Sequence, residues 1–171
     1  VNQTYKHIEY IIIDGVSTDG TLDLIEKYKS NIDILVSEKD KGIYDAMNKG
    51  LALATGDYVL FLNSGDELYS KETLANLAEV SEGADILYGE TFLINDQREI
   101  IGERRHQVPA HFNWKSFRYG MNICHQAIYV KRTLAEPYDL QYTLCADIDW
   151  VIKAAKKANI CVNAHQHVAR Y

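Results

Sequence analysis

Short apolar runs alternate with helical patterns along the first half of the chain, and this alternation constrains the fold more than any other feature. Residues 8–13 read IEYIII, an apolar run with β-branched residues that is typical of a strand covered on both faces. A helical pattern, in which Leu22, Ile25 and Tyr28 recur every three residues, follows it. A strand at Ile32–Val36, a helix at Gly42–Ala54 and a strand at Tyr58–Leu62 come next. Alternation of this kind predicts parallel β-α-β units.

The second half of the chain has a less regular order of elements. We expect helices at Glu72–Val80 and Asp147–Ala158, and strands at Asp85–Ile94, Arg98–Gly102, Gln126–Val130 and from Ile160 onwards. The first two of these strands are expected to form a hairpin, whereas residues 104–120 have no clean period and read as a long loop. The predicted fold class is therefore α/β, with a mostly parallel central sheet, helices on both of its faces and an antiparallel addition.

Composition limits the classes of protein that need to be considered. With 171 residues, of which 47% are hydrophobic, the chain can bury one core, so residues 1–171 are predicted to form a single domain. A formal net charge of −6 argues against a general affinity for nucleic acid. The three cysteines form no C-x-x-C pair and are typical of reduced thiols in a cytosolic protein. No apolar run is long enough to cross a membrane.

Two carboxylates follow predicted strands, at the edge where ligands bind in sheets of this kind. Asp14 ends the first apolar run, and Asp66 lies in the turn that follows Leu62. Carboxylates that face one crevice repel each other, so a divalent cation, Mg²⁺ or Mn²⁺, held together with a diphosphate would explain the pair. The alternative is that both aspartates hold their loops by accepting hydrogen bonds from nearby backbone N–H groups.

Three segments carry a resemblance to a known family. They read IEYIIIDGVSTDGT, SEKDKGIYDAMNKGLALATGDYVLFLNSGD and ADIDW, and together they extend from Ile8 to Trp150. In this order and at these separations they resemble the family-2 glycosyltransferases, inverting enzymes of the GT-A fold, and most closely the bacterial members that build cell-surface polysaccharides. The resemblance implies transfer of a sugar, with inversion, from a nucleotide-diphosphate sugar to a hydroxyl of a saccharide or lipid-linked saccharide. A UDP-sugar is the first expectation for the donor.

The resemblance also assigns residues to the nucleotide and to a metal ion. It implies that Asp14 contacts the base or the ribose. The residues that it places beside the nucleotide are Gly42, Asp45 and Asn48. The turn from Asn63 to Asp66 matches an acidic metal motif, but Asn63 and Gly65 stand where the family usually has aspartates. Asn63 is therefore expected to bond a ribose hydroxyl, and Asp66 alone is expected to hold Mg²⁺ or Mn²⁺.

On the acceptor side, the resemblance implies that Asp147 is the catalytic base, which takes the proton of the attacking hydroxyl. Asp149 is the rival base. Without the resemblance, these two aspartates would be interpreted as a helix cap and a charge that complements the helix dipole. His125 and Gln126 resemble a pair with an acceptor or phosphate role. Trp114 is expected in a lid or a sugar-stacking surface, unless its ring is simply packed.

The resemblance divides the chain into a nucleotide-binding half, residues 1–68, and an acceptor half, residues 69–171. It implies a strand before Val1 and further elements after Tyr171, so the domain is interpreted as truncated at both ends. The expected location is the cytoplasm, or the inner membrane surface for a lipid-linked acceptor. Two other functions stay open. One is a non-catalytic nucleotide- or sugar-binding module, and the other is a nucleotidyltransferase, although the basic, glycine-rich phosphate loop of such enzymes is not found here.

Overall fold

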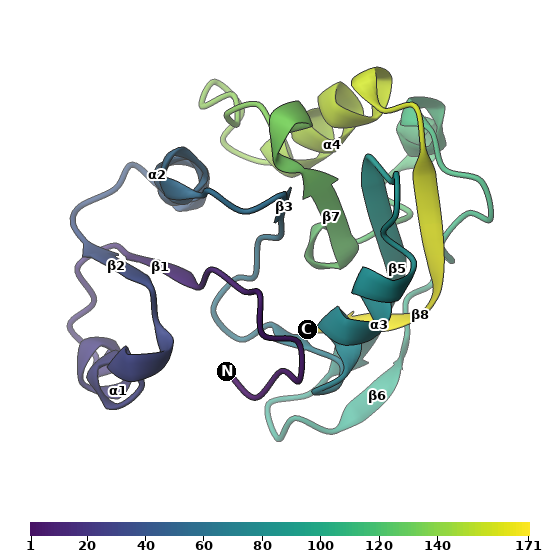
Figure 1. The fold of residues 1–171 in the computed structure, drawn as a ribbon. Coiled ribbons are helices and arrows are strands. Elements are labelled where there is room, and N and C mark those ends of the chain that lie inside the picture. Colours follow the sequence, from purple (N-terminus) through teal and green to yellow (C-terminus); the bar gives the residue numbers. More distant parts are fainter.

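The computed structural model describes residues 1–171 except for the side chain of Tyr119 (Figure 1). The strands are β1 (Ile11–Asp14), β2 (Ile34–Ser37), β3 (Tyr58–Val59), β4 (Glu67–Leu68), β5 (Ile86–Ile94), β6 (Ile100–Glu103), β7 (Ile128–Lys131) and β8 (Cys161–Arg170). The α-helices are α1 (Thr21–Lys27), α2 (Ile43–Leu53), α3 (Thr73–Glu79) and α4 (Ala146–Lys157). Short 3₁₀ helices are η1 (Lys29–Asn31), η2 (Trp114–Tyr119), η3 (His125–Ala127) and η4 (Arg132–Leu134).

The strands form two separate sheets, which lie on opposite sides of the view in Figure 1. The smaller sheet pairs β1 with β2 in parallel, as expected for two strands joined by the helix α1. The larger, six-stranded sheet has the order β3-β7-β5-β8-β4, and β6 pairs with β5. β1, which ends at Asp14, and β3, which precedes the Asn63 turn, therefore belong to different sheets in the described chain.

The expected balance of parallel and antiparallel pairing needs correction, because the larger sheet is mixed rather than mostly parallel. Among the described strands only β1 with β2 and β5 with β8 pair in parallel, and the other four pairings are antiparallel. The reason is the path of the chain. After β5 it reverses directly into the predicted hairpin with β6, and no helix lies between these two strands.

The core lies between the larger sheet and α4. Ile86, Ile128, Val130 and Val168, from β5, β7 and β8, are at most 1% exposed. The apolar face of α4 packs against them through buried residues such as Val151. By contrast, α1 contributes no buried residue among those described, and α2 contributes only Met47. The buried core is thus formed by the part of the molecule that carries Asp147.

Two predicted strands differ from the observed elements near the site. The run Tyr58–Leu62 is a strand only over Tyr58–Val59, because its pairing with β7 ends at Val59, which lies opposite Val130. His125 and Gln126 do not begin a strand, since they lie on the 3₁₀ helix η3 that precedes β7. The expected long loop at 104–120 contains η2, which begins with a capping box formed by Asn113 and Ser116.

The start of α4 also differs from the interpretation of Asp147 as a helix cap. The N-cap position is occupied by Cys145, with φ of 62°, and no side chain caps the helix there. Asp147 lies inside the first turn instead. Its carboxylate is consequently available to other parts of the chain.

Candidate active site

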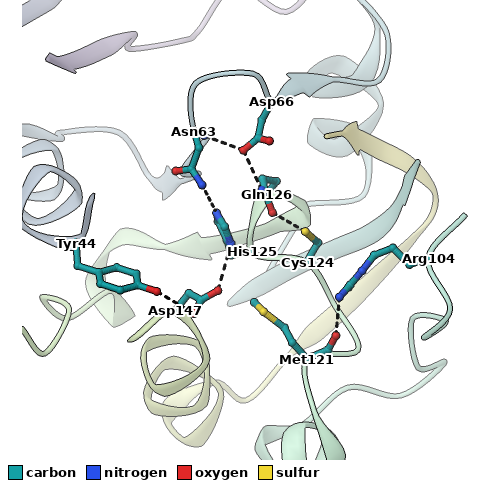
Figure 2. Close-up of polar contacts among 9 residues, drawn as sticks. All are labelled: Tyr44, Asn63, Asp66, Arg104, Met121, Cys124, His125, Gln126 and Asp147. Atoms are coloured by element: carbon teal, nitrogen blue, oxygen red, sulfur yellow. Dashed lines mark hydrogen bonds and ion pairs between the residues drawn. The ribbon is translucent and has the colours of Figure 1, made fainter. Parts of the chain in front are cut away.

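The turn after β3 and the helix η3 meet at Asp66 (Figure 2). The Oδ2 atom of Asp66 accepts hydrogen bonds from the backbone N–H of Asn63 and from Nε2 of Gln126, each at 2.9 Å. The Oδ1 atom of Asp66 has no hydrogen-bond partner among the described residues. One oxygen thus fixes the carboxylate, and the other is available to a ligand.

His125 connects the same turn to α4. Its Nε2 lies 3.1 Å from Nδ2 of Asn63, and its Nδ1 lies 3.3 Å from Oδ2 of Asp147. The hydroxyl of Tyr44, at the start of α2, donates to Oδ1 of Asp147 at 3.3 Å. Figure 2 shows the resulting chain of contacts from Tyr44 through Asp147 and His125 to Asn63. Four segments that are far apart in the sequence converge at this point.

The surroundings of Asp147 favour its ionised form. Its side chain is 16% exposed, and the hydrogen bond from His125 lowers the pKa of the carboxyl despite partial burial, with help from the backbone of Ile148 and from Tyr44. Burial and the neighbouring charge of Asp147 raise the pKa of Tyr44, which therefore keeps its proton and remains a donor. Asp147 is an anion at neutral pH and can accept a proton.

An aromatic stack holds α2 and α4 together behind Asp147. The ring of Tyr138 stacks on Tyr44 with centroids 5.4 Å apart, and on Trp150 of α4 with centroids 5.1 Å apart. Phe61 meets the edge of Trp150 at 5.4 Å. Such contacts add to area burial by about 0.5–1.5 kcal/mol per pair. The stack limits the movement of Tyr44 and of the first turn of α4.

Asn48 anchors this stack through the backbone. Its Oδ1 accepts from the N–H of Tyr138 at 2.6 Å, and its Nδ2 donates to the carbonyl of Tyr138 at 2.9 Å. Both polar groups of the Asn48 side chain are thus used within the chain. A contact of Asn48 with the nucleotide stays a prediction.

The other residues assigned to the nucleotide lie around the starts of α1 and α2. Asp14 is 5% exposed and accepts from the N–H groups of Val16 and Ser17 and from the hydroxyl of Ser37. The hydrogen bonds from Ser17 and Ser37 lower its pKa. Asp14 therefore holds its own loop, as the alternative interpretation expected.

Gly42 and Asp45 lie at the start of α2. Gly42, with φ of 117°, and Asp45 line a pocket together with residues 140, 142 and 143.

Two residues assigned to the acceptor side lie away from the Asp147 carboxylate. Asp149 pairs with Lys153 at 2.7 Å along α4. Trp114 is 43% exposed, and Nζ of Lys156 lies 5.3 Å from its ring. Lys156 is nine residues beyond Asp147, so Trp114 lies near the opposite end of α4, roughly 13 Å along the helix. Neither side chain joins the contacts of Figure 2.

Tyr44 is the site residue that sequence reasoning missed. It lies within the segment that resembles the family, but the resemblance assigns only its neighbours Gly42, Asp45 and Asn48. The available signal was an aromatic residue beside Asp45 in the first turn of the predicted helix. Its partner, Asp147, is 103 residues away.

The residues present suit a divalent ion that is held mainly by its ligand. Among the residues that the structure describes, no group of three or more His, Cys, Asp or Glu side chains is placed to hold a metal ion. Asp66 offers one carboxylate oxygen, and Mg²⁺ is commonly bound by one or two carboxylates, substrate phosphates and water. This donor set is therefore compatible with an ion that binds together with a diphosphate.

Comparison with known proteins decides the family. The model of the family described as "Glycosyl transferase family 2" matches residues 1–135. The chain belongs to glycosyl transferase family 2. The predicted family is confirmed, and the match includes the Asn63 turn and the His125–Gln126 pair.

Curated relatives of this family 2 chain are named as glycosyltransferases. A PGL/p-HBAD biosynthesis glycosyltransferase of Mycobacterium bovis (strain BCG / Pasteur 1173P2) is 35% identical over 175 residues, which cover 97% of this chain and 65% of the relative. An uncharacterized glycosyltransferase of Mycobacterium tuberculosis (strain ATCC 25618 / H37Rv) is 32% identical over 158 residues, which cover 90% of this chain and 60% of the relative. The chain thus spans less than two thirds of the length of these relatives.

Solved structures show the same fold at low sequence identity. The S. aureus TarS fragment 1–349 in complex with UDP-GlcNAc has a TM-score of 0.80 and 20% identity, and the match covers 99% of this chain and 51% of that one. The mannosyltransferase PcManGT from Pyrobaculum calidifontis, in complex with GDP-Man and Mn²⁺, has a TM-score of 0.70 and 16% identity, with coverage of 99% and 50%. These matches confirm the predicted GT-A-like α/β fold.

Proposed function

We propose that the chain carries the active site of an inverting glycosyltransferase, which moves a sugar from a nucleotide-diphosphate sugar to an acceptor hydroxyl. The observation that supports it is the arrangement of two carboxylates. Asp66 presents one oxygen where a diphosphate with its metal ion would lie, and the anionic Asp147 is linked to the same turn through His125 and Asn63. A leaving-group site and a base are the two parts that this transfer requires.

In the proposed reaction, Asp147 accepts the proton of the acceptor hydroxyl. As the proton moves to Asp147, the hydroxyl oxygen forms a bond with the anomeric carbon, and the bond from that carbon to the diphosphate oxygen breaks with its electron pair on the oxygen. A single displacement of this kind inverts the anomeric carbon, through an oxocarbenium-like state. Mg²⁺ or Mn²⁺ held by Asp66 would supply charge to offset the departing diphosphate.

A UDP-sugar is the donor that we propose first. TarS has been solved with UDP and with UDP-GlcNAc, whereas PcManGT has been solved with GDP-Man and Mn²⁺. The proposed nucleotide side comprises Asp14, Gly42, Asp45, Asn48 and Asn63. Of these, Gly42 and Asp45 line an open pocket beside Tyr44, which contacts Asp147.

The acceptor is proposed to be a saccharide or a lipid-linked saccharide, as in the synthesis of surface polysaccharides and glycolipids. The name of the mycobacterial relative indicates a role in PGL/p-HBAD biosynthesis. No helix in the described part of the chain is both long enough and apolar enough to span a membrane. We propose a cytoplasmic location, at the inner membrane surface when the acceptor is lipid-linked.

Titration calorimetry tests the donor site. UDP, GDP, dTDP and CDP would be titrated into the chain with and without Mn²⁺, and into the Asp66→Ala variant. We expect Mn²⁺ to strengthen binding of one nucleotide, UDP, and this effect to disappear in Asp66→Ala. Nucleotide binding that changes neither when Mn²⁺ is added nor when Asp66 is replaced by Ala would contradict the proposed metal site.

A non-catalytic binding module is the second candidate, because the metal motif has a single aspartate where the family usually has three. Replacement of Asp147 by Asn separates the two functions. An enzyme should keep nucleotide binding and lose transfer by about 10²–10⁴-fold, whereas a binding module has no transfer to lose. A wild-type chain that binds UDP but releases none from UDP-sugars would favour the module.

A further inference from the structure

His125 and Gln126 are consecutive residues, and their side chains reach the two carboxylates of the candidate active site. His125 contacts Asp147, and Gln126 contacts Asp66 (Figure 2). The two carboxylates are 81 positions apart in the sequence, yet adjacent residues hold both of them. Any shift of this dipeptide would therefore move both carboxylates together.

The imidazole of His125 is fully used within the chain. The amide nitrogen of Asn63 donates to Nε2, so the proton of a neutral ring lies on Nδ1 and is donated to Asp147. The side chain is only 14% exposed. With both ring nitrogens occupied, this imidazole has no nitrogen left for an acceptor or a phosphate.

The side chain of Gln126 is fixed in the same way. Gln126 is 5% exposed, its Oε1 accepts from the thiol of Cys124, and its Nε2 donates to Asp66. Burial raises the pKa of Cys124, so the thiol keeps the proton that it donates. The amide of Gln126 is thus oriented with its donor toward Asp66.

The dipeptide itself is anchored in the core. Ile123 and Ala127, on either side of it, are fully buried, and the N–H of Ala127 donates to the carbonyl of Cys124 at 2.9 Å. Because protein interiors are close-packed, such a segment has little room to shift. A rigid link of this kind is what precise placement of two reactive groups requires.

We propose that His125 and Gln126 are positioning residues, which fix the carboxylate of Asp147 relative to that of Asp66. This inference rests on the proposed function, because it concerns the base and the leaving-group side of that reaction. His125 then acts on the acceptor hydroxyl only through Asp147. Gln126 acts on the diphosphate only through Asp66.

Two variants of His125 separate positioning from direct contact. The amide nitrogen of an asparagine side chain lies near the place of Nδ1, so His125→Asn retains a donor toward Asp147 and loses the contact with Asn63. The amide of a glutamine side chain reaches the place of Nε2, so His125→Gln retains the contact with Asn63 and loses the donor. The two variants therefore break opposite ends of the link.

The measured quantities are kcat for release of nucleotide diphosphate, with water as acceptor, and Kd for UDP. The donors would be UDP-Glc, UDP-Gal, UDP-GlcNAc and GDP-Man. We expect His125→Gln to lower kcat on the order of 10²-fold with Kd unchanged, since Asp147 is misplaced. His125→Asn should lower kcat less and weaken UDP binding instead, because Asn63 is no longer held.

The pH profile gives a second readout. Asp147 is faced by His125 from η3, by Tyr44 from α2 and by the nearby Tyr138. Loss of the donor in His125→Gln raises the pKa of Asp147, so the acid limb of the profile for kcat should move to higher pH. The profile of His125→Asn should move less, because its amide still donates to Asp147.

The outcomes separate this inference from the proposed function. Equal loss of kcat in both His125 variants, with an unshifted pH profile, would overturn the positioning role. The proposed function would still stand if Asp147→Asn lowers release by about 10²–10⁴-fold. Absence of release from all four donors by the wild-type chain would overturn the proposed function, and the inference with it. His7→Asn and His7→Gln, at an exposed histidine near the start of the chain, should leave every readout unchanged. Melting temperatures of all variants check that they fold.

Discussion

Single residues of the candidate site take their roles from partners that are distant in sequence. Asp147 was assigned as the base from the resemblance alone, and the structure adds the two donors that keep it ionised, His125 and Tyr44. Asp14 and Asp66 share a different pattern, a carboxylate after a predicted strand, but the oxygens of Asp14 accept hydrogen bonds from its own loop and from Ser37, whereas Asp66 is held by Asn63 and Gln126. The pattern identified both of these residues, and only their surroundings distinguish a loop anchor from a potential ligand-binding carboxylate.

Tyr44→Phe tests the second donor to Asp147. The variant removes one hydrogen bond to a charged group, so kcat on the acid side of the pH–rate profile should fall by about tenfold. This bond helps to lower the pKa of Asp147, and its loss raises that pKa. Since the base must be ionised, the acid limb of the pH–rate profile should move to higher pH, and activity well above that limb should change less. Nucleotide release measured across about pH 3–7, which extends below the usual Asp pKa of about 4, checks this.

Tyr28→Phe provides the matched control, because Tyr28 is exposed at the end of α1. It should reproduce the wild-type profile. A Tyr44→Phe enzyme with the wild-type acid limb would show that Tyr44 does not stabilise the charge of Asp147.

At the scale of elements, the prediction was most accurate where the apolar period is longest. The helix expected at Asp147–Ala158 is observed at Ala146–Lys157, and its buried residues are Ala146, Trp150, Val151, Ala154 and Ala155. The strand expected at Tyr58–Leu62 is only two residues long. Helical hydrogen bonds are local, whereas a strand requires a partner from elsewhere in the chain, so strand lengths depend on the tertiary structure.

Asn48→Ala tests how α2 is attached to the segment before α4. The variant leaves the N–H and the carbonyl of Tyr138 without their side-chain partner, which should lower the free energy of unfolding by about 1–3 kcal/mol. Urea denaturation measures this change. Ala52→Gly, an exposed change in the same helix, should cost only about 1 kcal/mol through helix propensity.

If Asn48 also contacts the nucleotide, the folded Asn48→Ala variant will bind UDP with a higher Kd. This effect on binding would be separate from the fall in the free energy of unfolding. An unchanged free energy of unfolding would show that the bonds to Tyr138 contribute little. The two measurements thus assign the residue to the scaffold, to the ligand site or to both.

At the scale of the whole molecule, the central contact is the parallel pairing of β5 with β8. The register shifts between Tyr88 and Glu90, and again between Glu90 and Thr91. Gly89 lies within the first shift, where a Cβ atom would come within 2.7 Å of the carbonyl oxygen of Gln166 and 2.8 Å of Val168. The close approach of these strands therefore depends on a residue without a side chain.

Gly89→Ala should destabilise the protein by about 1–3 kcal/mol, because the added methyl group overpacks this contact. Gly56→Ala is the matched control, since a Cβ there would lie 3.7 Å from its nearest neighbour, an ordinary contact. Thermal unfolding of both variants measures the difference. Equal melting temperatures would show that β8 can move aside at no cost.

The family, the α/β class and the order of most elements could be predicted from the sequence alone, and so could the candidate carboxylates Asp66 and Asp147. These properties follow from local patterns, since apolar periods and short motifs are written in neighbouring residues. Three features are visible only in the folded chain: the larger sheet is mixed, Asp14 holds its loop, and His125 and Gln126 join Asp66 to Asp147. Hydrogen bonds between residues 60 to 103 positions apart depend on how the elements pack, and no local pattern contains that information.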